Sequence, residues 1–247
     1  MNIKDLKLFD HYSFTARLLP ALLTLLPLAF GIFAWAGTVA PWYSNLWIVF
    51  VTAGGTYALA AFARNAGKHR EQELWRSWGG TPTTQLLRYS GPANPVLRHR
   101  WHAALSTLLG RPMPTQQLEI TDPTGADQSY EAAVKVLIEN ARDTKAFPLV
   151  YKENVHYGFA RNLYALKTIG IISSILGVVS AVAASVWFIH IGKLQLMPWV
   201  CTGISLLLLL GWVFVIKPSW VKIPAFAYAE RLLASTEHLK PKRKDHK

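Results

Sequence analysis

The chain has 247 residues, of which 51% are hydrophobic and only 16% are charged, and its formal net charge is +12. Because an ordinary soluble domain has about 25% charged residues, this composition argues against a usual soluble protein. The single cysteine, Cys201, excludes an intrachain disulfide and a multi-cysteine metal site.

Long uncharged stretches are the strongest feature of the sequence. The stretches without Asp, Glu, Lys, Arg or His are 18–37, 46–63, 168–189 and 197–216. A bilayer core about 30 Å thick requires roughly 20 apolar residues in a helix, since every backbone polar group must be paired within the segment. We therefore expect an all-α, polytopic membrane protein with four transmembrane helices.

The positions of the basic residues predict the orientation in the membrane. All but one of the 26 Lys and Arg residues lie before the first span, between spans two and three, or after span four; the exception is Lys193. Positive residues are retained on the cytoplasmic side. We expect a multi-pass cell-membrane protein with both termini and residues 64–167 in the cytoplasm.

The predicted domains follow from this topology. They are a cytoplasmic N-terminus (1–17), a first transmembrane hairpin (18–63), a basic helical cytoplasmic domain (64–167), a second transmembrane hairpin (168–216) and a cationic cytoplasmic tail (217–247). Gly and Pro punctuation divides the central domain into helices, with Thr81 expected as a helix N-cap. The second span is expected to continue as a helix to Trp78, and Glu153 to Lys167 to lead without interruption into the third.

Basic and aromatic side chains alternate in the first half of the central domain. Such a mixture suits phosphate contact with base stacking, so it favours a nucleotide or single-stranded nucleic acid as ligand. The candidate ligand-binding residues are Arg88, Arg98, Arg100, Trp101 and Arg111. The alternative is that the basic residues face anionic lipid headgroups or keep the domain soluble.

No motif for enzymatic chemistry occurs. The sequence lacks G-x-S-x-G, a Walker-type phosphate loop, H-E-x-x-H and C-x-x-C, so neither an enzyme nor a cofactor is expected. His99 and His102 have a spacing compatible with metal binding, but Arg98 and Arg100 would repel a cation. A lipid-handling enzyme would require carboxylates or histidines that converge near the membrane interface.

Small residues recur along the third span. The candidates for an oligomer seam or a pore lining are Gly170, Ser173, Ser174, Gly177, Ala181 and Ser185. Small residues at four-residue spacing allow helices to approach closely, either within one chain or between copies in a homo-oligomer. The spans lack the ionisable residues of coupled transporters, which leaves a pore lined by small and hydroxyl side chains possible.

In layout, the chain has two spans, a basic cytoplasmic insert, two further spans and a cationic tail. This layout resembles the small membrane effectors of bacterial antiphage systems, among which the Hailong type is the most similar. The resemblance covers the architecture of the whole chain and implies a pore-forming oligomer controlled by a cytosolic nucleotide or oligonucleotide.

Two functions are therefore expected from the sequence. The first is an oligomeric membrane effector or ion channel that alters membrane permeability under control of an anionic cytosolic ligand, in antiviral defence. The second is a non-conducting membrane anchor or scaffold, whose cytoplasmic helices recruit a partner protein.

Overall fold

The computed structural model describes residues 11–35 and 43–239, with the backbone alone for residues 43–53. Within these ranges all regular structure is helical and no strand occurs, which confirms the all-α prediction. Residues 1–10, 36–42 and 240–247 lie outside the described residues, and with them most of the predicted N-terminus, part of the first hairpin and the cationic run at the end of the tail.

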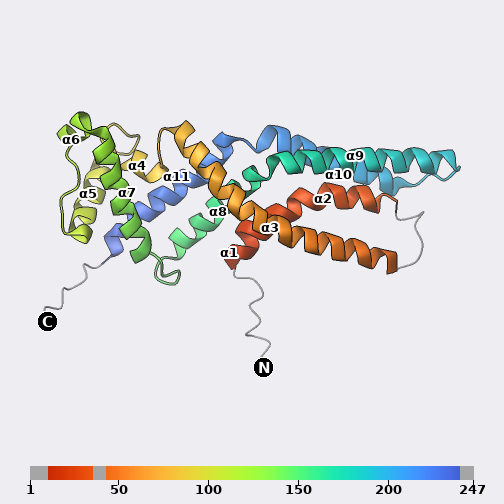
Figure 1. Ribbon diagram of the computed structural model, residues 1–247, viewed down its shortest axis with the longest axis horizontal. Helices are drawn as coiled ribbons and strands as arrows, with labels where there is room; N and C mark the ends of the chain where they lie inside the picture. Colours follow the sequence, from red (N-terminus) through yellow and green to blue (C-terminus); the bar gives the residue numbers. More distant parts are fainter. Residues whose placement is uncertain (1–10, 36–42, 240–247) are drawn as a thin grey trace, which may run out of the picture. The chain divides into compact units, whose positions relative to one another are not determined.

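The elements follow one another along the chain as in Figure 1. They are α1 (His11–Ser13), η2 (Phe14–Leu18), α2 (Leu19–Phe33), α3 (Tyr43–Trp78), α4 (Pro82–Leu87), α5 (Pro95–Leu109), α6 (Gln116–Thr121), α7 (Pro123–Asn140), α8 (Pro148–Ala165), α9 (Lys167–His190), α10 (Leu196–Leu210), η3 (Gly211–Val215), α11 (Pro218–Ala234) and η4 (Ser235–His238). The segments η2 and η3 are π-helical, and η4 is a 3-10 helix.

The chain divides into two compact units. The first unit comprises Met1–Glu71 with Gly158–Val221, and the second comprises Gln72–Tyr157 with Lys222–Lys247. The second unit thus differs from the predicted central domain, because it lacks 64–71 and 158–167 and gains Lys222–Lys247. The sequence assigned this last segment to a tail, whereas in the structure it contains most of α11, whose Ala229, Leu232 and Leu233 are buried.

Three helical stretches of the described chain, not four, are long and apolar enough to cross a membrane. They are His11–Phe33, Lys167–His190 and Leu196–Val215. The predicted span 46–63 is not one of them. It forms part of α3, a 36-residue helix whose later part is charged, and the side chains of residues 46–53 lie outside the described residues.

Three predictions about helix boundaries have different outcomes. The continuation of α3 to Trp78 is confirmed, as is the Thr81 cap, whose Oγ1 accepts a hydrogen bond from Thr84 N at 3.2 Å. The expected uninterrupted helix into the third span is wrong at one residue. Leu166, with ψ of 2°, separates α8 from α9, because at this ψ it leaves helical geometry.

The three apolar helices α2, α9 and α10 pack against one another, side by side in Figure 1. Glycines set the α2–α9 distance: a Cβ on Gly31 would lie 2.8 Å from Gly177 Cα. A Cβ on Gly177 would overlap the carbonyl group of Pro27. Ser180 Oγ donates to Gly31 O at 2.8 Å, so this close contact also pairs polar atoms. Small residues therefore permit the packing.

The second unit has its own hydrophobic core. Trp101 and Leu105 of α5, Tyr130 and Leu137 of α7, and Leu232 of α11 are all less than 5% exposed and belong to one cluster. The sequence periodicity predicts apolar stripes along both helices, and most of each stripe is buried, but Leu97 of α5 and Ile138 of α7 are 40% exposed.

Adding one methyl group to Gly177 tests the α2–α9 contact. We expect Gly177→Ala to destabilise the protein by about 1–3 kcal/mol, because backbone atoms of α2 occupy the space. Gly203→Ala is the matched control in α10, where no atom lies within 4 Å of the added Cβ. Thermal unfolding in detergent measures both; equal midpoints for the two variants would contradict the contact.

Candidate functional site

Three polar side chains of the first unit converge on the ends of the apolar helices. They are Arg161 and Asn162, near the end of α8, and Lys167, the first residue of α9. We call them the polar junction. Each makes contact with a different neighbouring helix, so the short segment that holds them connects several elements.

Asn162 pairs with the first π-helical segment. Its side chain is 1% exposed, and its Nδ2 donates to the backbone oxygen of Ala16, within η2, at 2.6 Å. A π-helical turn shifts the backbone pairing by one residue, and a carbonyl displaced from regular pairing needs another donor when it is buried. The Asn162 amide supplies a donor to a carbonyl of this segment.

Lys167 pairs with the end of the second π-helical segment. Its Nζ donates to Ile216 O at 2.7 Å and, more distantly, to Val213 O at 3.4 Å. The last carbonyls of a helix lack intrahelical partners and carry partial negative charge, which an ammonium group complements. Lys167 therefore caps the end of the α10–η3 helix.

Arg161 connects α8 to α3 through an ion pair. Its guanidinium lies 2.9 Å from a carboxylate oxygen of Glu71, and the two side chains are 13% and 14% exposed. Taking charges out of water is costly, and each charge of this pair offsets part of that cost for the other. The pair therefore favours one alignment of α3 with α8 over others.

Glycines allow the helices to meet at the junction. A Cβ on Gly67 would overlap the Asn162 side chain, and one on Gly158 would lie 2.9 Å from Tyr12 Oη and 3.1 Å from Ala16 Cβ. These contacts bring α3 and the α1–η2 segment against α8. Such an arrangement holds the helices together.

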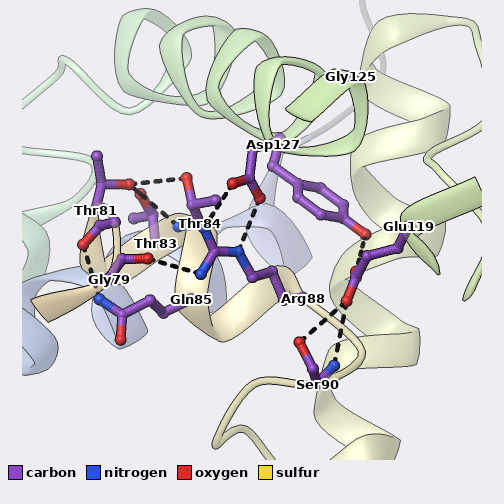
Figure 2. A network of polar contacts seen from close by, with 12 residues as sticks. Gly79, Thr81, Thr83, Thr84, Gln85, Arg88, Ser90, Glu119, Gly125 and Asp127 are labelled. Carbon is purple, nitrogen blue, oxygen red and sulfur yellow. Dashed lines mark hydrogen bonds and ion pairs between the residues drawn. The ribbon is translucent and has the colours of Figure 1, made fainter. Parts of the chain in front are cut away.

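The second unit contains a separate polar network, drawn in Figure 2. Arg88 donates Nε to Asp127 Oδ1 at 2.8 Å and a terminal nitrogen to Asp127 Oδ2 at 2.5 Å, while its other terminal nitrogen donates to Gly79 O. The hydrogen bonds and charge of Asp127 raise the pKa of Arg88 above its ordinary value, despite partial burial. Arg88, a predicted ligand-binding residue, is thus bound to a carboxylate of its own chain.

The other predicted ligand-binding residues do not form one site with Arg88. Arg98 is 9% exposed, donates to Arg88 O at 3.2 Å and lies 5.2 Å from the Tyr89 ring centre, and Trp101 belongs to the core. Arg100 pairs with Glu237 at 2.8 Å but is 56% exposed. Arg111 is exposed. A soluble anion would therefore meet Arg100 and Arg111 first.

A pocket of about 240 Å³ lies beside the Arg100–Glu237 pair. Its lining residues are Ala104, Thr107, Leu108, Thr236, Glu237 and Leu239. The one charged side chain among them is a carboxylate, so the pocket does not suit an anionic ligand.

Glu119 fixes the turn that follows Arg88. Its carboxylate accepts hydrogen bonds from Tyr89 N at 2.9 Å, Ser90 N at 3.3 Å, Ser90 Oγ at 3.2 Å and Tyr130 Oη at 2.8 Å (Figure 2). Burial acts to raise the pKa of Glu119, but these hydrogen bonds outweigh it and the pKa lies below its ordinary value. Burial and the bond to Glu119 raise the pKa of Tyr130.

The six small residues of α9 that the sequence predicted as an oligomer seam or pore are buried within the chain. The six candidates for an oligomer seam or pore are Gly170, Ser173, Ser174, Gly177, Ala181 and Ser185. The Trp212 ring occupies the space beside Gly170, and Pro27 that beside Gly177. Packing within one chain accounts for this burial, and a seam between copies stays a prediction.

Neither metal chemistry nor known relatives identify the protein. No group of three or more His, Cys, Asp or Glu side chains within the described ranges is arranged to hold a metal ion. No protein-family model, curated protein or solved structure matches the chain.

Neither the polar junction nor Glu119 was predicted as a site from the sequence. A usable signal existed for the junction: Gly158, Arg161 and Asn162 share one helical face by spacing, directly before an uncharged stretch. Glu119 had no comparable signal, since its neighbours Leu118 and Ile120 are apolar and its partners lie 11 to 30 positions away.

Removing the Asn162 amide tests the junction. We expect Asn162→Leu to lower the unfolding free energy by about 1–3 kcal/mol, because the buried Ala16 O would lose the hydrogen bond that Asn162 Nδ2 donates. Asn140→Leu is the control, since Asn140 bonds within its own exposed helix turn. Thermal unfolding in detergent measures both, and an Asn162→Leu midpoint at or above that of the control would exclude the role.

The lowered pKa of Glu119 predicts a pH dependence. As the pH falls from the ordinary value of about 4.5 toward the folded pKa, the unfolded chain takes up the proton first, so the stabilisation by Glu119 is lost. We expect the stability difference between wild type and Glu119→Gln to be constant near neutral pH and to shrink below about pH 4.5. Unfolding midpoints measured at several pH values give this stability difference, and Glu131→Gln, at an exposed position, is the control. A stability difference between wild type and Glu119→Gln that grows on acidification would contradict the role of Glu119.

Proposed function

We propose that the chain is an oligomeric membrane effector or channel that alters membrane permeability under control of an anionic cytosolic ligand, in antiphage defence. The observation that carries the proposal is the polar junction, where one short segment binds the ends of apolar helices that have no charged side chain at their centres. A change in the position of that segment would therefore move the ends of several helices together.

The proposed topology has four spans, with both termini and residues 64–167 in the cytoplasm. Three candidate spans, His11–Phe33, Lys167–His190 and Leu196–Val215, support membrane insertion. The uncharged stretch 46–63 would be the fourth, and the one-sided distribution of Lys and Arg supports the orientation.

The π-helical segments support a change in permeability. Two of the three candidate spans contain one, η2 or η3, and both segments are bound by the junction. Conversion of a π turn to regular α-helix rotates the following residues by roughly 100°, the angle of one residue. Such a rotation would change which side chains face a pathway through the membrane.

The ligand part of the proposal rests on Arg100 and Arg111. Both are exposed, and the net charge of +12 favours an anionic partner such as an oligonucleotide. Arg88, Arg98 and Trp101 contribute to the fold around them.

The second candidate function is a non-conducting scaffold that recruits a cytosolic partner. The observation that favours it is the exposure of apolar side chains on the second unit, with Val96 at 69% and Ile120 at 66%. Exposed apolar groups often mark protein contacts.

Ion flux through liposomes distinguishes the two functions. We expect purified protein to conduct ions, and short oligonucleotides to change the flux. Arg100→Glu with Arg111→Glu should weaken the oligonucleotide effect at least tenfold in concentration, the equivalent of about 1.4 kcal/mol. Lys135→Glu, at another exposed position on the same unit, is the control. If no ion flux is measured in any condition, the channel function is excluded and the scaffold function remains.

A further inference from the structure

A buried histidine of α5 holds the end of α4 in the second unit. His102 is 7% exposed, and its Nε2 lies 2.8 Å from the backbone oxygen of Leu87, the last residue of α4. A carbonyl oxygen can only accept a hydrogen bond, so Nε2 carries a proton and donates it. The last carbonyls of a helix lack donors within the helix, and His102 supplies one of them for α4.

Two tyrosine rings enclose the imidazole of His102. The Tyr89 ring lies 5.2 Å away between centres, at an angle of 85° between planes, and the Tyr130 ring of α7 lies 5.6 Å away. Within the described residues the imidazole has one hydrogen bond, that of Nε2. A proton added to Nδ1 would therefore find no acceptor among them.

The surroundings of His102 oppose a positive charge on its ring. Burial is the main reason why the pKa of His102 lies below its ordinary value of 6.5, although the hydrogen bond to Leu87 O acts in the opposite direction. The charges of Arg98 and His99 on α5 lower this pKa further, whereas the carboxylate of Glu119 on α6 raises it. The ring is therefore neutral at pH 7, and its protonation on acidification is costly in the folded chain.

The turn after α4 is held by the same face of α5. Arg98 donates to Arg88 O at 3.2 Å and lies 5.2 Å from the centre of the Tyr89 ring, while His102 holds Leu87. Residues four apart are neighbours on a helix, so a charged His102 would place a second cation beside Arg98 against this turn. Like charges at this spacing repel, and the burial of both side chains limits screening by water.

We propose that His102 is a proton-sensitive switch, whose protonation separates Leu87 and the turn 88–90 from α5. Opening of this contact would admit water to the imidazole, and water solvates the charged ring better than the apolar surroundings do. The inference goes beyond the proposed function and is the same for a channel and for a scaffold, since it concerns the second unit alone.

Hydrogen exchange of the full-length protein in detergent, followed by mass spectrometry, tests the switch. The variant is His102→Gln, whose side-chain amide can still donate to Leu87 O but does not titrate. Comparison with wild type at the same pH removes the intrinsic effect of pH on exchange. We expect equal protection of the peptide 85–93 at about pH 7.5, and several-fold faster exchange in wild type at about pH 5.5, because the unfavourable protonation costs up to about tenfold in equilibrium constant per pH unit.

His99→Gln is the matched control. His99 lies on the same helix but is exposed, so this variant should exchange like wild type at both pH values. Glu119 stays charged at about pH 5.5, since its pKa lies below its ordinary value of about 4.5. Equal exchange of wild type and His102→Gln at the lower pH would overturn the proposal. A loss of protection spread evenly over all peptides of the second unit would also overturn it, because the opening would then not be local to the turn.

Wild type alone gives a second measurement, which does not require His102→Gln to fold. After correction for intrinsic rates, the exchange of the peptide 85–93 relative to that of an α7 peptide should rise several-fold between about pH 7.5 and about pH 5.5. An unchanged ratio would overturn the switch, since the turn would then be held equally well by the neutral and the charged imidazole.

Discussion

The pairing of backbone carbonyls at the ends of the apolar helices is the constraint on which the first unit depends. A carbonyl that leaves regular helical pairing in an apolar environment has no water to bind, so a side chain must supply the donor. Asn162 does so for Ala16, and Lys167 for Ile216. These two contacts pair carbonyls in or next to the π-helical segments of two candidate spans.

The polar junction also explains why glycine occurs beside it. Asn162 can reach Ala16 only because Gly67 and Gly158 leave room for the neighbouring helices. The Arg161–Glu71 pair then aligns α3 with α8, since one orientation satisfies both charges. The polar contacts of the junction and the close approach of the helices at the glycines therefore depend on each other within this unit.

In the second unit, buried charges have a related role. Asp127 binds Arg88, Glu119 binds the Tyr89 turn, and Arg98 lies over the Tyr89 ring. Each charged group has its partners inside the unit, which offsets the cost of its removal from water. One consequence is that arginines which suggest anion binding in the sequence are partly used to build the fold.

Much of the helical structure could be predicted from local sequence. The α7 stripe that includes Tyr130 and Leu137 is buried as its periodicity indicates, and Thr81 and Asn94 cap the helices they precede. The candidate site could not be predicted in the same way. Asn162 and Ala16 are 146 positions apart, and Tyr89 and Glu119 are 30 apart, so no local pattern reveals these partners.

The sequence by itself determined the elements: charge-free stretches long enough for a bilayer, punctuated helices between them, and basic residues gathered outside them. These properties depend only on the composition and spacing of residues within short segments, so they are the same whatever fold the chain adopts. Only the tertiary structure decided that Gly177 packs against Pro27, that Arg88 binds Asp127, and that Leu118 and Ile120 face outward while Glu119 is buried. Those outcomes depend on which distant residues supply a partner or occupy a space, and close packing makes that choice only when the whole unit is assembled.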